Sequence, residues 1–121
     1  MESPTAPGHS LIVNEDADGV TIVSFSQVRI LDAQNEQQLG EELTKLVDGP
    51  RRILLNLSEV QFLSSGALAQ VINLKRQVAD LGGKLRLCGI PPQLYAVFRV
   101  TKLDTYFDIR EDEEAALDGF E

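Results

Sequence analysis

Two adjacent serines, Ser64 and Ser65, are the side chains whose type and position best fit a chemical role in this sequence. They lie in the segment VQFLSSGAL (residues 60–68), between a strand-like run and a helix-like run. A hydroxyl at such a junction has three possible roles: it caps the helix, attacks a substrate, or accepts a phosphate. A cap alone is a complete explanation, because serine is a preferred N-cap residue that stabilises a helix by about 1 kcal/mol.

Nucleophilic catalysis has little support in the sequence. A serine nucleophile needs a base within hydrogen-bond reach, and the only histidine is His9, in a stretch (1–9) expected to be a flexible N-terminal tail. The segment FLSSG also lacks the first glycine of the G-x-S-x-G nucleophile elbow. Neither the P-loop spacing nor the usual zinc or calcium ligand spacing is present. We therefore expect no enzyme activity, no metal and no cofactor.

Phosphate acceptance at Ser64, with Ser65 as the alternative, fits the local geometry. The free amides and the positive dipole end of the following helix favour a negative group at its N-terminus. A phosphate would add about −1.5 to −2 charge there and change the sign of the outward surface. The fold beneath would be preserved, so the site is suited to a switch.

The hydrophobic pattern predicts the elements that place these serines. Strands are expected at residues 11–13, 20–25, 51–57, 84–90 and 106–109, and residues 28–31 form a short third strand or extend the second. Residues 14–19 are expected to form a turn, with Asp18-Gly19 as a hairpin signal. Helices are expected from a cap at Asp32 or Asn35 to residue 48, over 67–81, from Pro91-Pro92, and from residue 111. This order predicts a mixed central sheet with a leading hairpin, packed by about four helices.

Composition limits the other classes of function. The 121 residues suit one domain, 10–121, after the tail, and the net charge of −8 opposes nucleic-acid binding. No apolar run is long enough for a membrane span and no secretory signal is recognisable, so we expect no membrane insertion and a cytoplasmic location. Cys88, the single cysteine, lies in a strand-like run and is expected to be a small buried hydrophobe.

Three motifs occur together in a familiar order: NLSEVQFLSSGAL (56–68), GGKLRLCGIPP (82–92) and TKLDTYF (101–107). They resemble the STAS family, the sulphate-transporter and anti-sigma-factor-antagonist domains, whose usual run is D-L-S-x-V-x-F-I-D-S-S/T-G-L. The resemblance extends over about residues 20–117. It implies a small α/β domain that binds protein partners and catalyses nothing itself.

The resemblance also implies a role for Ser64. In the family's anti-sigma factor antagonists, the serine after the motif's aspartate is phosphorylated by a kinase that is also the anti-sigma factor. The dephosphorylated form binds that kinase and frees the sigma factor. Ser64 matches this serine and Ser65 takes the second Ser/Thr place, whereas Leu63 and Asn56 stand where the family has aspartates. Loss of the carboxylate beside Ser64 removes a charge that a kinase could recognise and lowers repulsion against a phosphate.

We therefore expect a regulatory binding module whose partner is an anti-sigma factor or serine-kinase-like protein. The candidate partner-binding residues lie on and before the helix after the serines: Leu63, Gly66, Gln70, Asn73 and Gln77. The alternative is a non-phosphorylated scaffold or adaptor subunit that assembles with other STAS proteins in a signalling or transport complex. Leu63 favours this alternative, because it adds apolar area to the junction instead of charge.

Overall fold

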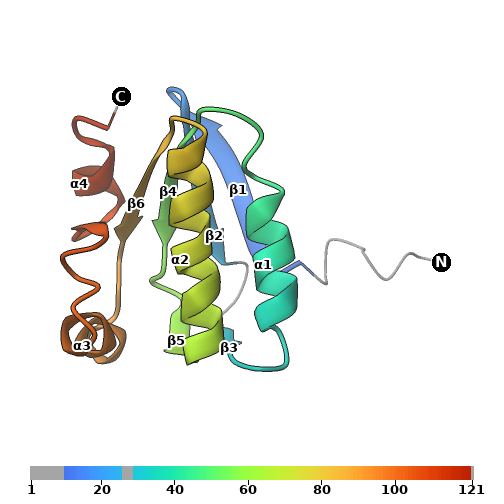
Figure 1. Ribbon diagram of the computed structural model, residues 1–121. Coiled ribbons are helices and arrows are strands. Elements are labelled where there is room, and N and C mark those ends of the chain that lie inside the picture. Colours follow the sequence, from blue (N-terminus) through green and yellow to red (C-terminus); the bar gives the residue numbers. More distant parts are fainter. Residues whose placement is uncertain (1–9, 26–28, 121) are drawn as a thin grey trace.

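The computed structural model describes residues 10–25 and 29–120, which form a sheet with helices on both faces (Figure 1). The predicted tail, residues 1–9, lies outside this part of the chain. The strands are β1 (Ile12–Ala17), β2 (Val20–Phe25), β3 (Arg29–Leu31), β4 (Arg52–Asn56), β5 (Val60–Leu63), β6 (Lys84–Cys88) and β7 (Asp108–Arg110). The helices are α1 (Glu36–Thr44), α2 (Ser65–Asp80), α3 (Pro92–Val100) and α4 (Glu113–Leu117).

The main sheet has the order β1-β2-β4-β6-β7. Strands β1 and β2 form the predicted antiparallel hairpin, and the other neighbours are parallel. Asp18 and Gly19 take positive φ values of 54° and 83°, as a two-residue hairpin turn requires. The expected turn over residues 14–17 is wrong, because these residues pair with β2. Their polar side chains suggested a turn, but they are polar because β1 is an edge strand whose side chains are mostly exposed.

Both faces of the main sheet are covered, as the continuous apolar run of the central strand predicted. Helices α1 and α2 lie side by side on one face and α4 lies on the other (Figure 1). Ile53 and Leu55 belong to the larger core under α1 and α2, whereas Leu54 belongs to the smaller core under α4. The alternation of a strand thus divides three consecutive apolar residues between two cores.

Helix α2 buries the predicted stripe of Leu68, Val71, Leu74 and Val78. Leu81, predicted as the end of the stripe, is 47% exposed because the helix has already ended at Asp80. Gly82 follows with a φ of +83°, and the Gly83 amide donates to the Val78 carbonyl at 2.8 Å. The Gly-Gly stop signal is therefore confirmed.

Strands β3 and β5 form a separate two-stranded parallel sheet that the sequence did not predict. A turn closed by the Val60 amide and the Leu57 carbonyl (3.0 Å) takes the chain out of the main sheet after β4. Strand β5 then runs beside β3 and leads directly into α2. Helices α1 and α2 both begin at this end of the molecule, next to the small sheet (Figure 1).

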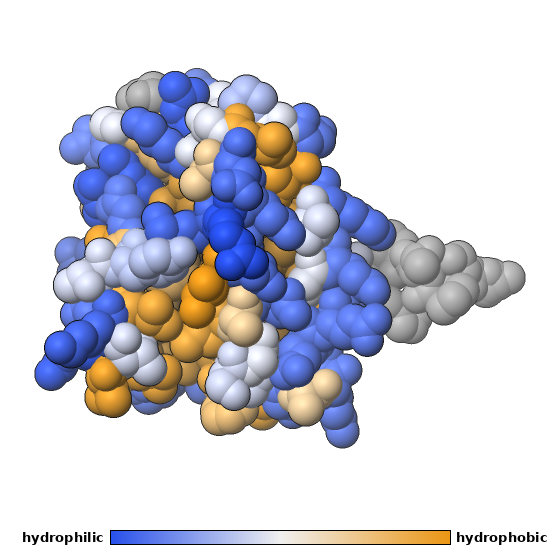
Figure 2. Space-filling model, in the orientation of Figure 1, coloured by the Kyte–Doolittle hydropathy of each residue, from blue (hydrophilic) through white to orange (hydrophobic). Residues whose placement is uncertain are grey.

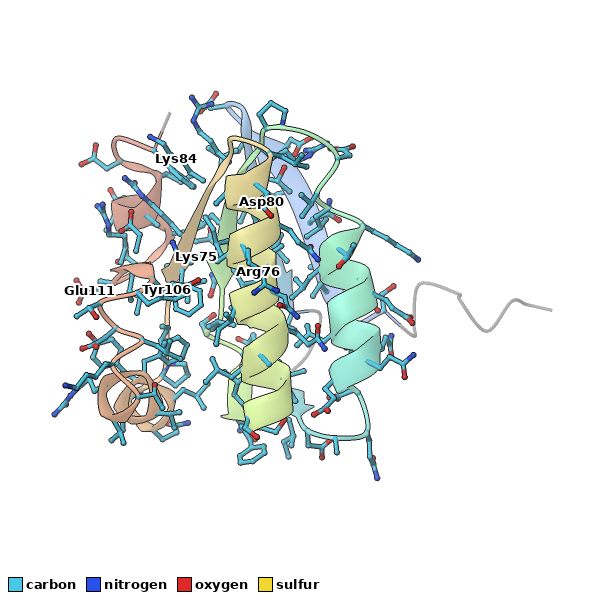
Figure 3. All side chains as sticks on the ribbon, viewed as in Figure 1. Lys75, Arg76, Asp80, Lys84, Tyr106 and Glu111 are labelled. Atoms are coloured by element: carbon cyan, nitrogen blue, oxygen red, sulfur yellow. The ribbon has the colours of Figure 1, made fainter. Side chains whose placement is uncertain are left out.

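Two cationic side chains contribute to the contact between the C-terminal third and the rest of the fold. Lys75 reaches from α2 toward Tyr106, with Nζ 5.0 Å from the ring centroid (Figure 3). Arg86 on β6 donates to the carbonyl oxygens of Ala116 (2.8 Å) and Asp118 (3.0 Å). Strand β7 starts two residues later than predicted, and α4 starts after its cap, Asp112, instead of at residue 111.

Within the described residues, no helix combines the length and the apolar character that crossing a bilayer requires.

Candidate functional site

Ser64 joins the small sheet to α2. Its amide donates to the Leu31 carbonyl on β3 at 2.8 Å, which continues the pairing of β3 with β5. Its backbone is extended (φ −69°, ψ 165°), and its Oγ accepts from the Ala67 amide at 3.0 Å. Ser64 is therefore the N-cap of α2 and is half-buried, whereas Ser65 is the first helical residue and is exposed.

The Ser64 hydroxyl has a second partner that sequence analysis did not identify. Its Oγ donates to Oε2 of Glu36, the first residue of α1, at 3.3 Å. The carboxylate therefore lies at the N-terminal end of α2, where the helix dipole favours a negative charge. No short-range signal in the sequence indicated the pair, because the two residues are 28 positions apart.

Gly66 leaves room for this carboxylate. A Cβ atom at position 66 would overlap the carboxylate group of Glu36. Gly66, which was predicted to be a partner-binding residue, lies beside the Glu36 side chain in the structure, and its lack of a Cβ leaves space for that carboxylate next to Ser64. A side chain at position 66 would therefore displace the flexible end of the Glu36 side chain and not the backbone of α1.

The turn before α1 is closed by the side chain of Asn35, the residue next to Glu36. The Asn35 Oδ1 accepts from the Asp32 amide, and the Asn35 Nδ2 donates to the Ile30 carbonyl, both at 3.0 Å. Asn35 is the N-cap position, but its side chain makes no cap hydrogen bond to α1. The expected capping of α1 by this side chain is wrong, because Asn35 instead closes the turn between β3 and the helix.

The other predicted partner-binding residues have different surroundings. Leu63 is 6% exposed and packs in the larger core, so any effect on a partner is indirect. Gln70 lies against Gly40 of α1, and the Gln77 Oε1 accepts from Thr44 Oγ1 at 3.3 Å. The Asn73 Oδ1 accepts from Arg76 Nη2 at 2.8 Å on the exposed side of α2. Gln70 and Gln77 thus line the α1–α2 contact, and Asn73 lies beside it.

Apolar side chains also reach the surface near Ser64. Ile30 on β3 and Phe62 on β5 are paired in register and are 54% and 49% exposed. Two α3 residues, Val97 and Val100, are 37% and 83% exposed. Figure 2 shows hydrophobic side chains at the end of the molecule where β5, α3 and the start of α2 lie, whereas the surface over α1 is mostly hydrophilic. We call Ile30 and Phe62 the apolar pair.

The site has no catalytic or metal-binding constellation among the residues that the structure describes. No group of three or more His, Cys, Asp or Glu side chains in residues 10–25 and 29–120 is placed to hold a metal. The ionisable side chain that contacts the Ser64 hydroxyl is the Glu36 carboxylate, at 3.3 Å. Cys88 is buried as predicted, and burial raises the pKa of its thiol to about 12, so it is not a reactive thiolate.

Asn56, which stands where the family has an aspartate, makes hydrogen bonds through both ends of its amide side chain. The Asn56 Nδ2 donates to Glu113 Oε2 of α4 at 2.7 Å, and its Oδ1 accepts from the Ser58 amide at 2.9 Å. An amide side chain supplies both a donor and an acceptor, whereas an ionised aspartate could only accept. Asn56 therefore joins β4 to α4.

Comparison with known proteins places the chain in one family. The profile of the STAS domain matches residues 12–116. The chain therefore belongs to the STAS family, as the three motifs indicated.

Individual relatives indicate which kind of STAS protein the chain resembles. BtrV of Bordetella bronchiseptica, named as a candidate anti-sigma factor antagonist, is 32% identical over 104 residues, which cover 85% of this chain and 88% of BtrV. An anti-sigma factor antagonist from Mycobacterium paratuberculosis superposes with a TM-score of 0.79 at 25% identity, covering 90% of this chain and 92% of that one. The phosphorylated form of the Bacillus cell fate determinant SpoIIAA superposes with a TM-score of 0.63 at 18% identity, covering 88% and 96%. The protein is thus an anti-sigma factor antagonist-like STAS domain.

Proposed function

We propose that this protein is a regulatory binding module that acts as an anti-sigma factor antagonist and is switched by phosphorylation of Ser64. It acts by binding, not by catalysis. The partner is an anti-sigma factor that is also a serine kinase, and other STAS proteins are possible co-subunits. The dephosphorylated form binds the partner and the phosphorylated form does not.

The observation that carries this proposal is the position of Ser64 beside the apolar pair. An exposed aromatic next to an exposed aliphatic side chain is a typical anchor for a protein partner, because its burial excludes water from the contact. Ser64 lies directly after β5, so a phosphate there would add about −1.5 to −2 charge at the edge of that anchor. Desolvating this charge in an apolar contact opposes binding.

The transfer step itself is ordinary. The Ser64 Oγ attacks the γ-phosphorus of a nucleoside triphosphate held by the kinase, and the bond from that phosphorus to the bridging oxygen breaks. The nucleoside diphosphate leaves, and the hydroxyl proton passes to a base of the kinase. Ser65, which is exposed and one residue further on, is the alternative acceptor.

Ser64→Asp and Ser64→Asn form a matched pair for the test. Both side chains cap a helix, and they differ by one charge. We expect Ser64→Asn to bind the anti-sigma factor kinase like the unphosphorylated protein and Ser64→Asp to bind at least about tenfold more weakly, by calorimetry. Intact mass and phosphosite mapping of the protein from its own host should place one phosphate on Ser64. Equal binding by the two variants would remove the switch.

A second candidate function is a scaffold subunit that is never phosphorylated. Two features favour it: the Ser64 hydroxyl already has two hydrogen-bond partners, and Leu63 is buried in place of the family's aspartate. If this protein, purified from its own host, carries no phosphate and still co-purifies with other STAS proteins, that result would support the scaffold function.

A further inference from the structure

We propose that the Glu36 carboxylate and a phosphate on Ser64 compete for the same place at the N-terminus of α2, so that phosphorylation displaces Glu36 and loosens the contact between α1 and α2. This inference rests on the proposed function, since it concerns how the same serine is regulated. It assigns a role to a residue of α1 outside the motif of the family.

The first argument is steric. The Glu36 Oε2 is the acceptor for the Ser64 hydroxyl at 3.3 Å, and the same carboxylate fills the space over Gly66. On the other side, the Ser64 Oγ is occupied by the Ala67 amide at 3.0 Å. A phosphate attached to this oxygen must therefore extend into the volume that Glu36 now fills, or the cap of α2 must open.

The second argument is electrostatic. The dipole of α2 favours one negative group at its N-terminus, and Glu36 already supplies it. A phosphate of charge about −1.5 to −2 in contact with this carboxylate is repelled. The N-terminus of α2 therefore holds either the carboxylate of α1 or the phosphate.

The consequence reaches beyond Ser64. Glu36 is the first residue of α1, and the first turns of α1 and α2 meet through Glu36 and Gly66, then through Gly40 and Gln70. Displacement of the carboxylate releases the first of these contacts. The surface that a partner meets then changes over the start of α1 as well as at Ser64.

The test installs phosphoserine at position 64 through an expanded genetic code, so that no kinase is needed. Four proteins are compared, with serine or phosphoserine at 64 and with Glu36 or Glu36→Gln. Glu41→Gln is the matched control: it removes the same charge from the exposed side of the same helix, where Glu41 contacts Gln37 and not Ser64.

Glu36→Gln is expected to change two measured quantities, the second pKa of phosphoserine and the effect of phosphorylation on stability. In ³¹P NMR titrations, the second pKa of phosphoserine should be higher with Glu36 than with Glu36→Gln by at least about half a unit, because a neighbouring carboxylate disfavours the dianion. In urea unfolding, phosphorylation should lower the folding equilibrium constant about tenfold more in the Glu36 protein than in Glu36→Gln. Glu41→Gln should leave both values as in the Glu36 protein.

Equal phosphate pKa values with Glu36 and Glu36→Gln, together with additive unfolding free energies, would overturn the role of Glu36. That result would leave the proposed switch standing, because Ser64→Asp and Ser64→Asn would still differ in partner binding. Conversely, equal partner binding by those two variants would end the switch while the coupling between Glu36 and phosphoserine remained measurable.

Discussion

Asn56 and Glu113 join the end of the central strand to the last helix through a hydrogen bond of 2.7 Å between residues 57 positions apart. Strand β4 lies in the middle of the main sheet, and α4 packs on the Leu54 side of it, opposite to the Ile53 and Leu55 side that α1 and α2 cover. Together with the bonds from Arg86 to the Ala116 and Asp118 carbonyls, this bond holds the short helix α4 over the smaller core. It also explains why this chain has an amide where the family has a carboxylate.

Asn56→Asp is expected to lower the free energy of unfolding at pH 7 by about 1–3 kcal/mol, measured by urea denaturation. The substitution removes the donor to Glu113 and places two carboxylates in contact. The double variant Asn56→Asp with Glu113→Gln restores one donor between the two side chains and should recover most of the loss. If the double variant is no more stable than Asn56→Asp, the contact is not what holds α4.

Ser64→Ala is expected to lower the free energy of unfolding by about 1 kcal/mol, because the Ala67 amide loses its cap. Ser64→Asn keeps a cap acceptor and should lie within a few tenths of a kcal/mol of the native protein. Chemical denaturation of the two variants separates the structural role of the hydroxyl from its role in binding. A destabilised Ser64→Asn protein would contradict this account of the cap.

Cys88 should make the protein less stable at alkaline pH. Burial raises the pKa of its thiol from 9.0 to about 12, so between these values the unfolded chain loses a proton that the folded chain keeps. The stabilisation is complete below pH 9 and is lost as the pH rises, by up to about 1.4 kcal/mol per pH unit. Unfolding free energies from pH 8 to 10.5 should fall more steeply for the native protein than for Cys88→Ala. Parallel curves would show that Cys88 does not titrate in this way.

Gly83→Ala should destabilise the fold more than Gly82→Ala. A Cβ at position 83 would overlap the Arg51 carbonyl oxygen and lie 2.8 Å from the Arg51 nitrogen, so backbone must move, at about 2–3 kcal/mol. A Cβ at position 82 would make an ordinary contact with the Pro50 side chain at 3.9 Å, but the φ of +83° costs alanine about 1 kcal/mol. Thermal unfolding of the two variants ranks them, and the reverse order would show that steric contact is not the dominant cost.

Phe62→Ala should weaken binding to the proposed anti-sigma factor partner at least tenfold while lowering the free energy of unfolding by less than about 1 kcal/mol, because half of the side chain is exposed. Leu81→Ala is the control: Leu81 is 47% exposed but follows the C-terminal end of α2, at the opposite end from Ser64. Isothermal calorimetry with the Ser64→Ala background avoids any effect of phosphate. Equal losses for the two variants would place the partner elsewhere.

The amino-acid sequence alone determined those features whose cause lies within a few residues. Asp18-Gly19 predicted the hairpin because both residues tolerate positive φ, and Gly82-Gly83 predicted the end of α2 because Gly82 takes a positive φ. The serine at the start of α2 read correctly as a cap, because a cap bond spans only three residues. The family could also be recognised from sequence alone, because each of its motifs is a contiguous run of residues.

Only the tertiary structure decided what surrounds Ser64. The small sheet of β3 and β5, and with it the apolar pair, depends on residues about thirty positions apart that pair only when the chain has folded. The Glu36–Ser64 and Asn56–Glu113 contacts are equally long-range. Hydrophobic periodicity reports which side of an element is buried, but not which polar group from another element lies beside it. The charge environment of the serine was therefore set by packing and not by the motif that contains it.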